Sequence, residues 1–235
     1  MASPPGPGPE LTPAFQPILD ISSGLIAGFE ALARWRGSTP DRALEDPALA
    51  PHMLMRSAEA LSDWRRETGR ADLFANVNLT AFDLIAPELP VLIEELVRGF
   101  DLGPGQLRIE ITEQAAISDL DAALEAVAIV KQAGVGLILD DFGTGHSSFA
   151  WLADLPADGL KIDHELTARL GQPRADTIME AITLLAARLG MTATAEGVET
   201  REAVKPLRAL GFQYVQGFAF GRPMTTSDAA AYLKA

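Results

Sequence analysis

The stretch "LILDDFGTGHSS", residues 137–148, starts as an apolar strand and ends in two adjacent aspartates before a Gly-x-Gly turn. Taken alone, the Asp140–Asp141 pair is best explained as the N-cap of a following helix. The glycines would be needed in any tight turn. If neighbouring strands also end in polar side chains, the pair could instead belong to a functional site. The pattern of the whole chain decides between a helix cap and such a site.

Strand and helix patterns alternate from Asp72 to the end of the chain. The strands, such as "DLFANVNL" (72–79) and "GQLRIEIT" (105–112), are short and apolar on both faces, which is typical of a parallel sheet covered by helices. About six strands follow this pattern. Two further strands, "AFQPILDI" and "LIAGFEALARW", come first and are joined by a turn at 22–24, so they should be antiparallel. The sequence therefore predicts an α/β fold, a modified TIM (β/α)8 barrel with an antiparallel first strand.

The composition narrows the class of protein. The chain has 235 residues, 48% hydrophobic residues and a net charge of −13, which argues against general attraction to DNA or to an anionic membrane. It has no cysteine and no apolar run long enough to span a membrane, so we expect a cytoplasmic protein without a membrane segment. Residues 1–12 are rich in Pro and Gly and predict a disordered linker, leaving residues 13–235 as one domain. An upstream domain and an untidy terminus explain that linker equally well.

Nearly every predicted strand delivers a polar side chain to its C-terminal end, the end at which barrel enzymes carry their chemistry. In chain order these residues are Glu30, Asn78, Glu110, Asp140 with Asp141, Lys161 with Asp163, Glu196 and Gln216. Converging carboxylates repel one another strongly unless cations lie among them. Oxygen ligands without His or Cys favour Mg²⁺, Mn²⁺ or Ca²⁺, and two such ions could form a phosphoryl-transfer site.

Each of these residues also has an ordinary structural explanation. A glutamate at a strand end is usually a solvated rim residue, a buried Lys161 is often a salt-bridge partner, and Asn78 could simply satisfy loop backbone. Asp140 and Asp141, being consecutive in a strand, should point in diverging directions. Seven polar strand ends in succession are much harder to explain in this way, so we favour a common site.

The ordered motifs resemble one known family. "FEALARW", "VNLT", "EITE", "DDFGTG", "LKID", "AEGVET" and "VQGFAFGRP" are similar, in this order, to the blocks of the EAL-domain phosphodiesterases. These enzymes hydrolyse the bacterial messenger cyclic di-GMP to linear pGpG. The resemblance covers roughly residues 15–224 and implies the modified barrel that the strand pattern predicts.

The resemblance implies a centre of two Mg²⁺ or Mn²⁺ ions. Ca²⁺ is larger and less strict in its coordination geometry, so it should inhibit the enzyme. The implied ligands of the first ion are Glu30, Asn78, Glu110 and Asp140. Asp140 would bridge the ions, Asp141 would hold the second, and Glu196 would lie near the second ion as ligand and general base. Lys161 would be catalytic, holding a metal-bound water or a phosphate oxygen.

The resemblance also implies residues around the substrate. Those implied to contact the substrate or its water are Arg34, Leu32, Gln216, Asp163 and Glu199, and Glu113 is implied to brace the glycine-rich loop. A homodimer is implied as well, and the Pro/Gly linker suggests an upstream regulatory domain in the parent protein. The chain departs from the family in a shortened 37–58 region without "F-I-P" and in His146, which replaces an aromatic residue.

Three functions follow as hypotheses. An active cyclic di-GMP phosphodiesterase is favoured because every implied ligand is present. A non-catalytic cyclic di-GMP receptor is the alternative, and an unrelated metal-dependent barrel hydrolase is the third. His164 and His52 are interpreted as residues without a special role.

Overall fold

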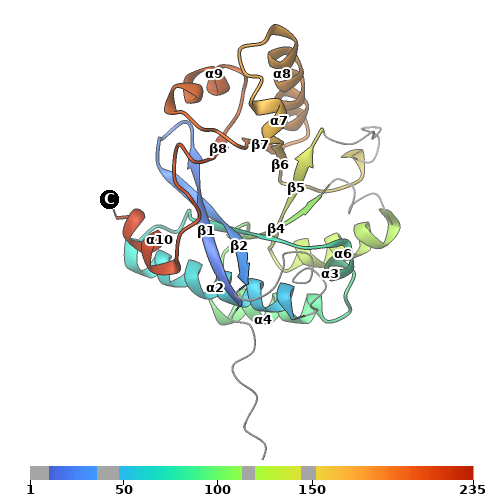
Figure 1. The fold of residues 1–235 in the computed structure, drawn as a ribbon. Coiled ribbons are helices and arrows are strands. Elements are labelled where there is room, and N and C mark those ends of the chain that lie inside the picture. The colour runs from blue at the N-terminus through green and yellow to red at the C-terminus, as the bar shows by residue number, and fades with distance from the viewer. Residues whose placement is uncertain (1–10, 36–47, 113–119, 144–151, 235) are drawn as a thin grey trace, which may run out of the picture.

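Eight strands close into a barrel in chain order in the computed structural model, which describes residues 11–35, 48–112, 120–143 and 152–234 (Figure 1). The strands are β1 (Leu11–Asp20), β2 (Ile26–Trp35), β3 (Phe74–Asn78), β4 (Leu107–Thr112), β5 (Gly136–Phe142), β6 (Gly159–Ile162), β7 (Thr192–Ala195) and β8 (Tyr214–Gln216). The barrel confirms the fold class that the alternating pattern predicts.

The first strand is the irregular one. β1 runs antiparallel to both of its neighbours, β2 and β8, whereas the pairs from β2 to β8 are parallel. The tight turn after Asp20 causes this, because it returns the chain directly into β2. One boundary is corrected: Leu11 and Thr12, predicted as linker, belong to β1 and pair with the far end of β2. Residues 1–10 lie outside the described part of the chain.

The helices surround the strands, and α10 lies beside α2 (Figure 1). The longer ones, all expected from the sequence, are α2 (Leu49–Thr68), α4 (Leu89–Gly99), α6 (Leu120–Gln132), α8 (Pro173–Arg188), α9 (Val204–Ala209) after the 3-10 turn η2 (Arg201–Ala203), and α10 (Thr226–Tyr232). Two four-residue helices were not expected, α3 (Ala81–Leu84) and α7 (His164–Thr167). Side-chain caps from Thr80 and Asp163 start them. The helix expected near 148–153 lies mostly outside the described residues.

The core fills the space between barrel and helices. Under α2, Trp64 packs against Phe15 of β1 and Phe29 of β2, with ring centroids 4.8 and 4.7 Å apart. All three side chains are buried. Burial of such aromatic side chains contributes about 2–3 kcal/mol each relative to exposure, so this cluster anchors the irregular hairpin to α2. Among the described residues, no helix has the length and apolarity needed to cross a membrane.

Candidate active site

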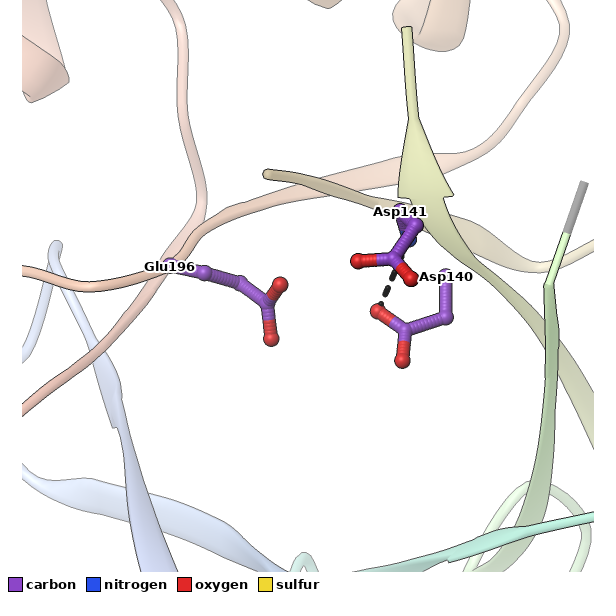
Figure 2. A group of neighbouring side chains, drawn as sticks. All are labelled: Asp140, Asp141 and Glu196. Atoms are coloured by element: carbon purple, nitrogen blue, oxygen red, sulfur yellow. Dashed lines mark hydrogen bonds between the residues drawn. The ribbon is translucent and has the colours of Figure 1, made fainter. Parts of the chain in front are cut away.

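Three carboxylates meet at the mouth of the barrel. Asp140 and Asp141 come from the end of β5 and Glu196 from the residue after β7, and one oxygen of each lies within 4.8 Å of the others. Figure 2 shows Glu196 pointing across the mouth toward the two aspartates. Such a group of oxygen ligands suits a hard divalent cation.

A local irregularity in β5 brings both aspartates to the same place. The pairing of β5 with β6 shifts register between Leu139 and Phe142, and Asp141 has a φ of 54°, in the left-handed region. In a regular strand, consecutive side chains point to opposite faces. The sequence-based expectation that Asp140 and Asp141 diverge is therefore wrong, because the bulge turns Asp141 toward Asp140 and Glu196 (Figure 2).

Lys161 lies beneath these carboxylates. Its side chain, only 1% exposed, rises from β6, and its Nζ lies 2.7 Å from Glu196, 3.1 Å from Glu110, 3.2 Å from Glu30 and 3.4 Å from Asp140. A buried ammonium with four carboxylate neighbours is strongly held in its charged form. The pKa of Lys161 is accordingly raised well above its usual value, because these carboxylates outweigh the opposing effect of burial.

Amide side chains orient the two deepest carboxylates. Glu30 accepts hydrogen bonds from Asn78 Nδ2 at 2.8 Å and from Gln216 Nε2 at 2.6 Å. Glu110 accepts one from Asn76 Nδ2 at 2.6 Å. Apart from Gln216, these residues lie at neighbouring positions on the inner face of β2, β3 and β4. In the sheet register Glu30 is opposite Asn76 and Asn78 is opposite Glu110, which brings the amides beside the carboxylates. The carbonyl oxygens Asn76 Oδ1 and Gln216 Oε1 are buried without a protein partner.

The environment separates the pKa values of the carboxylates. Burial raises the pKa of Glu196 to about 7 and raises that of Glu110 well above its usual value. Burial would also raise the pKa of Glu30, but Lys161 and the two amide donors outweigh it and leave that pKa lowered. The pKa of Asp141 is raised by burial and by the adjacent Asp140. A carboxylate that titrates near neutrality in a cleft is a candidate general base.

A cleft of about 670 Å³ opens beside the carboxylates. Its lining includes the buried Glu30 and Gln216 and the half-buried Glu196, together with three exposed residues, Glu199, His164 and Phe218. Phe218 is 54% exposed, and the guanidinium of Arg222 lies 4.2 Å from its ring centroid. The volume falls in the range of small-molecule sites, and an exposed aromatic ring offers a stacking surface for a base.

Most of the site residues predicted from the sequence meet in this region. Glu30, Asn78, Glu110, Asp140, Asp141, Lys161, Glu196 and Gln216 form one contact network, and Glu199 lines the cleft. Asp163 is buried and its carboxylate binds His164 Nδ1 and Glu165 N. Leu32 and Arg34 are not among the described residues that line the cleft. Glu113 and His146 fall outside the described residues.

Two residues of the site, Asn76 and Phe218, were not singled out from the sequence, and His164 was interpreted as having no special role. Asn76 precedes Asn78 by two positions in "FANVNLT", so the alternation of the strand places both on the inner face. Phe218 follows the "VQG" motif directly. His164 follows "LKID", and only the start of α7 reveals that it faces the cleft. The first two had a signal in the sequence, whereas the third did not.

The donor set fits divalent cations. Among the described residues, the candidate metal group consists of carboxylates, and the buried amide oxygens Asn76 Oδ1 and Gln216 Oε1 nearby lack protein partners. Hard cations such as Mg²⁺ and Mn²⁺ prefer oxygen ligands of this kind. Asp140, Asp141 and Glu196 lie close enough together to hold such an ion. The further ligands predicted from the sequence, Glu30, Asn78 and Glu110, are linked to them through Lys161 and through the hydrogen bond from Asn78 to Glu30.

The antiparallel first strand and the acidic mouth define the class: a modified TIM barrel with a site suited to divalent cations. Comparison with known proteins then identifies the family. The chain belongs to the EAL domain family, whose model matches residues 8–223.

Relatives of known activity agree with this assignment. A cyclic di-GMP phosphodiesterase of Pseudomonas aeruginosa is 32% identical over 94% of this chain and 39% of its own length. The solved PaMucR phosphodiesterase, in complex with cyclic di-GMP, is 31% identical with a TM-score of 0.83 over 93% of this chain and 94% of its own. BlrP1 of Klebsiella pneumoniae, solved with cyclic di-GMP and calcium, is 28% identical with a TM-score of 0.79 over 96% of this chain and 59% of its own.

The matched segment is a small part of the curated relatives. The chain spans between 27% and 39% of the length of the first four.

Proposed function

We propose that this domain hydrolyses cyclic di-GMP to linear pGpG with two Mg²⁺ or Mn²⁺ ions. The observation that carries the proposal is the convergence of Asp140, Asp141 and Glu196 within 4.8 Å, beside a cleft of about 670 Å³. The phosphodiesterase and the cyclic di-GMP complexes among its relatives support the same substrate.

The side chains divide the work of hydrolysis. Glu196 would accept a proton from the attacking water, a role that its pKa of about 7 supports. Lys161, whose pKa is raised well above its usual value, carries a positive charge among the carboxylates and would stabilise a phosphate oxygen as its charge grows. Bound divalent ions supply charge stabilisation and a lowered pKa for water. Asn78 and Gln216 keep Glu30 oriented toward the mouth.

Further parts of the proposal concern substrate and partners. We assign Gln216, Glu199 and Asp163 to the substrate and water shell, Leu32 and Arg34 to its outer edge, and Glu113 to the support of the glycine-rich loop. We propose that the domain acts in the cytoplasm as a homodimer within a larger signalling protein. The greater length of the curated relatives supports the last point.

A single substitution tests the enzyme against its alternative, a non-catalytic receptor. Wild-type domain with Mn²⁺ should convert cyclic di-GMP to pGpG, measured by chromatography. Glu196→Ala should lower turnover by about a thousandfold, because it removes the proton acceptor, while binding measured by calorimetry persists. Glu180→Ala, an exposed glutamate on α8, is the matched control and should behave as wild type.

The other outcomes distinguish the rival functions. Tight binding by the wild type without pGpG formation would establish the receptor. Faster cleavage of unrelated phosphodiesters would favour the third hypothesis, a different barrel hydrolase. Ca²⁺ has looser coordination geometry than Mg²⁺, so we propose that it supports binding and inhibits turnover.

A further inference from the structure

His164 lies at the outer part of the cleft in a fixed orientation. It is the first residue of α7, and its Nδ1 lies 2.7 Å from Asp163 Oδ2. The Asp163 side chain is 10% exposed and its other oxygen caps α7 through Glu165 N, so the carboxylate is held at both ends. The imidazole itself is 70% exposed and lines the cleft. When Nδ1 donates to Asp163, the ring leaves Nε2 free for a ligand.

The chain that follows Glu196 packs tightly against this histidine. Gly197 has a φ of 66°, and a Cβ atom added there would lie 2.5 Å from His164 Cβ and 3.3 Å from its Cα. Glycine at this position therefore lets the loop that carries Glu196 pass directly over the base of His164. His164 and the catalytic loop are in contact, which ties the position of the imidazole to the position of Glu196.

His164 differs in charge from the other ionisable side chains that line the cleft. Among the described residues that line the cleft, His164 is the one side chain that can carry a positive charge, whereas Glu30, Glu196 and Glu199 can carry negative charges. Lys161 lies beneath and is paired with four carboxylates. A dianionic dinucleotide therefore meets a lining of glutamates in which His164 is the cationic side chain, and Arg222, stacked on the Phe218 ring, is a further cation beside that lining.

We infer that His164, oriented by Asp163, is a substrate-binding residue whose Nε2 contacts a phosphodiester oxygen of the bound dinucleotide. This inference rests on the proposed function, because it names a contact to that substrate. Its role is binding: it supplies charge and a donor at the rim while the proton acceptor remains Glu196.

The surroundings of the imidazole favour its cationic form. The hydrogen bond to Asp163 raises the pKa of His164, and the negative charges of Asp163, Glu165 and Glu196 act in the same direction. Asp141 is a further neighbour, since His164 lowers the pKa of that carboxyl. In the cationic form both ring nitrogens donate, so Nε2 can serve an anionic oxygen while Nδ1 stays with Asp163.

Steady-state kinetics with cyclic di-GMP and Mn²⁺ test the inference. His164→Gln keeps a polar side chain but loses the charge, and should raise KM by about tenfold with kcat within about twofold, as expected for one charge-assisted contact. His164→Lys restores a cation and should recover most of the KM. Asp163→Asn keeps an oxygen for the helix cap and should raise KM less than His164→Gln. Equilibrium binding in Ca²⁺ should weaken in parallel with KM.

A control and the contrary outcomes complete the test. Arg56→Gln removes one exposed positive charge from α2, away from the cleft, and should leave KM unchanged. Unchanged KM and binding in His164→Gln, or a loss of kcat alone, would overturn the inference while leaving the phosphodiesterase intact. Equal effects from Arg56→Gln would show a general charge effect and also overturn it. A wild type that neither binds nor cleaves cyclic di-GMP would overturn the proposed function itself.

Discussion

Glu196 combines two environments that pull its proton affinity in opposite directions. Burial favours the neutral acid, and Lys161 Nζ at 2.7 Å favours the carboxylate. Burial prevails and the pKa rises to about 7. The raised pKa makes Glu196 a good proton acceptor near neutral pH. It also means that ionisation of Glu196 lowers the free energy of unfolding of the domain.

This effect of ionisation predicts a pH dependence of stability. The folded pKa of Glu196, about 7, exceeds the unfolded value of 4.5. The folded state holds the proton of Glu196 more tightly than the unfolded state does, which stabilises the fold. This stabilisation of about 3 kcal/mol is fully present below pH 4.5 and is lost as the pH rises through about 7. Glu196→Gln cannot ionise, so without divalent cations its free energy of unfolding relative to wild type should improve by about this amount between pH 5 and pH 8.

Urea denaturation in a chelating buffer at both pH values measures this difference. Glu180→Gln, on the exposed face of α8, serves as control and should show the same relative stability at pH 5 and pH 8. If the difference between Glu196→Gln and wild type were also independent of pH, the raised pKa would be refuted.

At the scale of the element, the backbone at the end of β5 is strained where it positions the carboxylates of the site. Asp141 adopts a φ of 54°, a conformation that costs a residue with a Cβ about 1–2 kcal/mol. The bulge that requires it also aligns two like charges, Asp140 and Asp141, which repel each other. Both costs are local, and both would be offset by a cation bound between the carboxylates.

Two substitutions separate the strain from the charge. Asp141→Gly and Asp141→Ala both remove the carboxylate, but only glycine adopts a positive φ without penalty. Asp141→Gly should therefore be more stable than Asp141→Ala by about 1 kcal/mol, measured by thermal or urea unfolding without metal. Both variants should lose affinity for Mn²⁺ equally. Equal stability of the two variants would show that the backbone at 141 is unstrained.

The strand positions could be predicted from the sequence, but the bulge could not. Apolar runs such as residues 135–139 identify buried strands because a parallel sheet excludes polar residues from both faces. The direction of Asp141 depends on a register shift between β5 and β6, which is a property of two paired strands and leaves no periodic signal in either. The position of His164 in the cleft could not be predicted for a similar reason, since it depends on the short helix α7, which one capping side chain, Asp163, starts.

At the scale of the whole molecule, barrel closure explains why residues far apart in sequence converge. β1 pairs with β8 through Ile18, Leu19 and Asp20, which joins the first and last strands of the barrel, and Gln216 Nε2 lies 2.6 Å from Glu30 Oε2. The order of the strands and the hairpin could be inferred from sequence, and so could the set of polar strand ends. Which of those ends touch could not, because contacts across the barrel depend on its closure and stagger.

Closure also concentrates negative charge in a protein whose net charge is already −13, so divalent cations should stabilise the whole domain. Binding at 100 times Kd contributes about 2.7 kcal/mol, and in a chain of this size each kcal/mol raises Tm by about 2–4 °C. Calorimetry with saturating Mn²⁺ should therefore show Tm higher by about 5–10 °C, and Asp140→Asn should lose most of that increase.

NaCl at equal ionic strength controls for screening of the net charge. An equal rise with NaCl, or an undiminished rise in Asp140→Asn, would mean that the ions act on the surface charge and not at the barrel mouth.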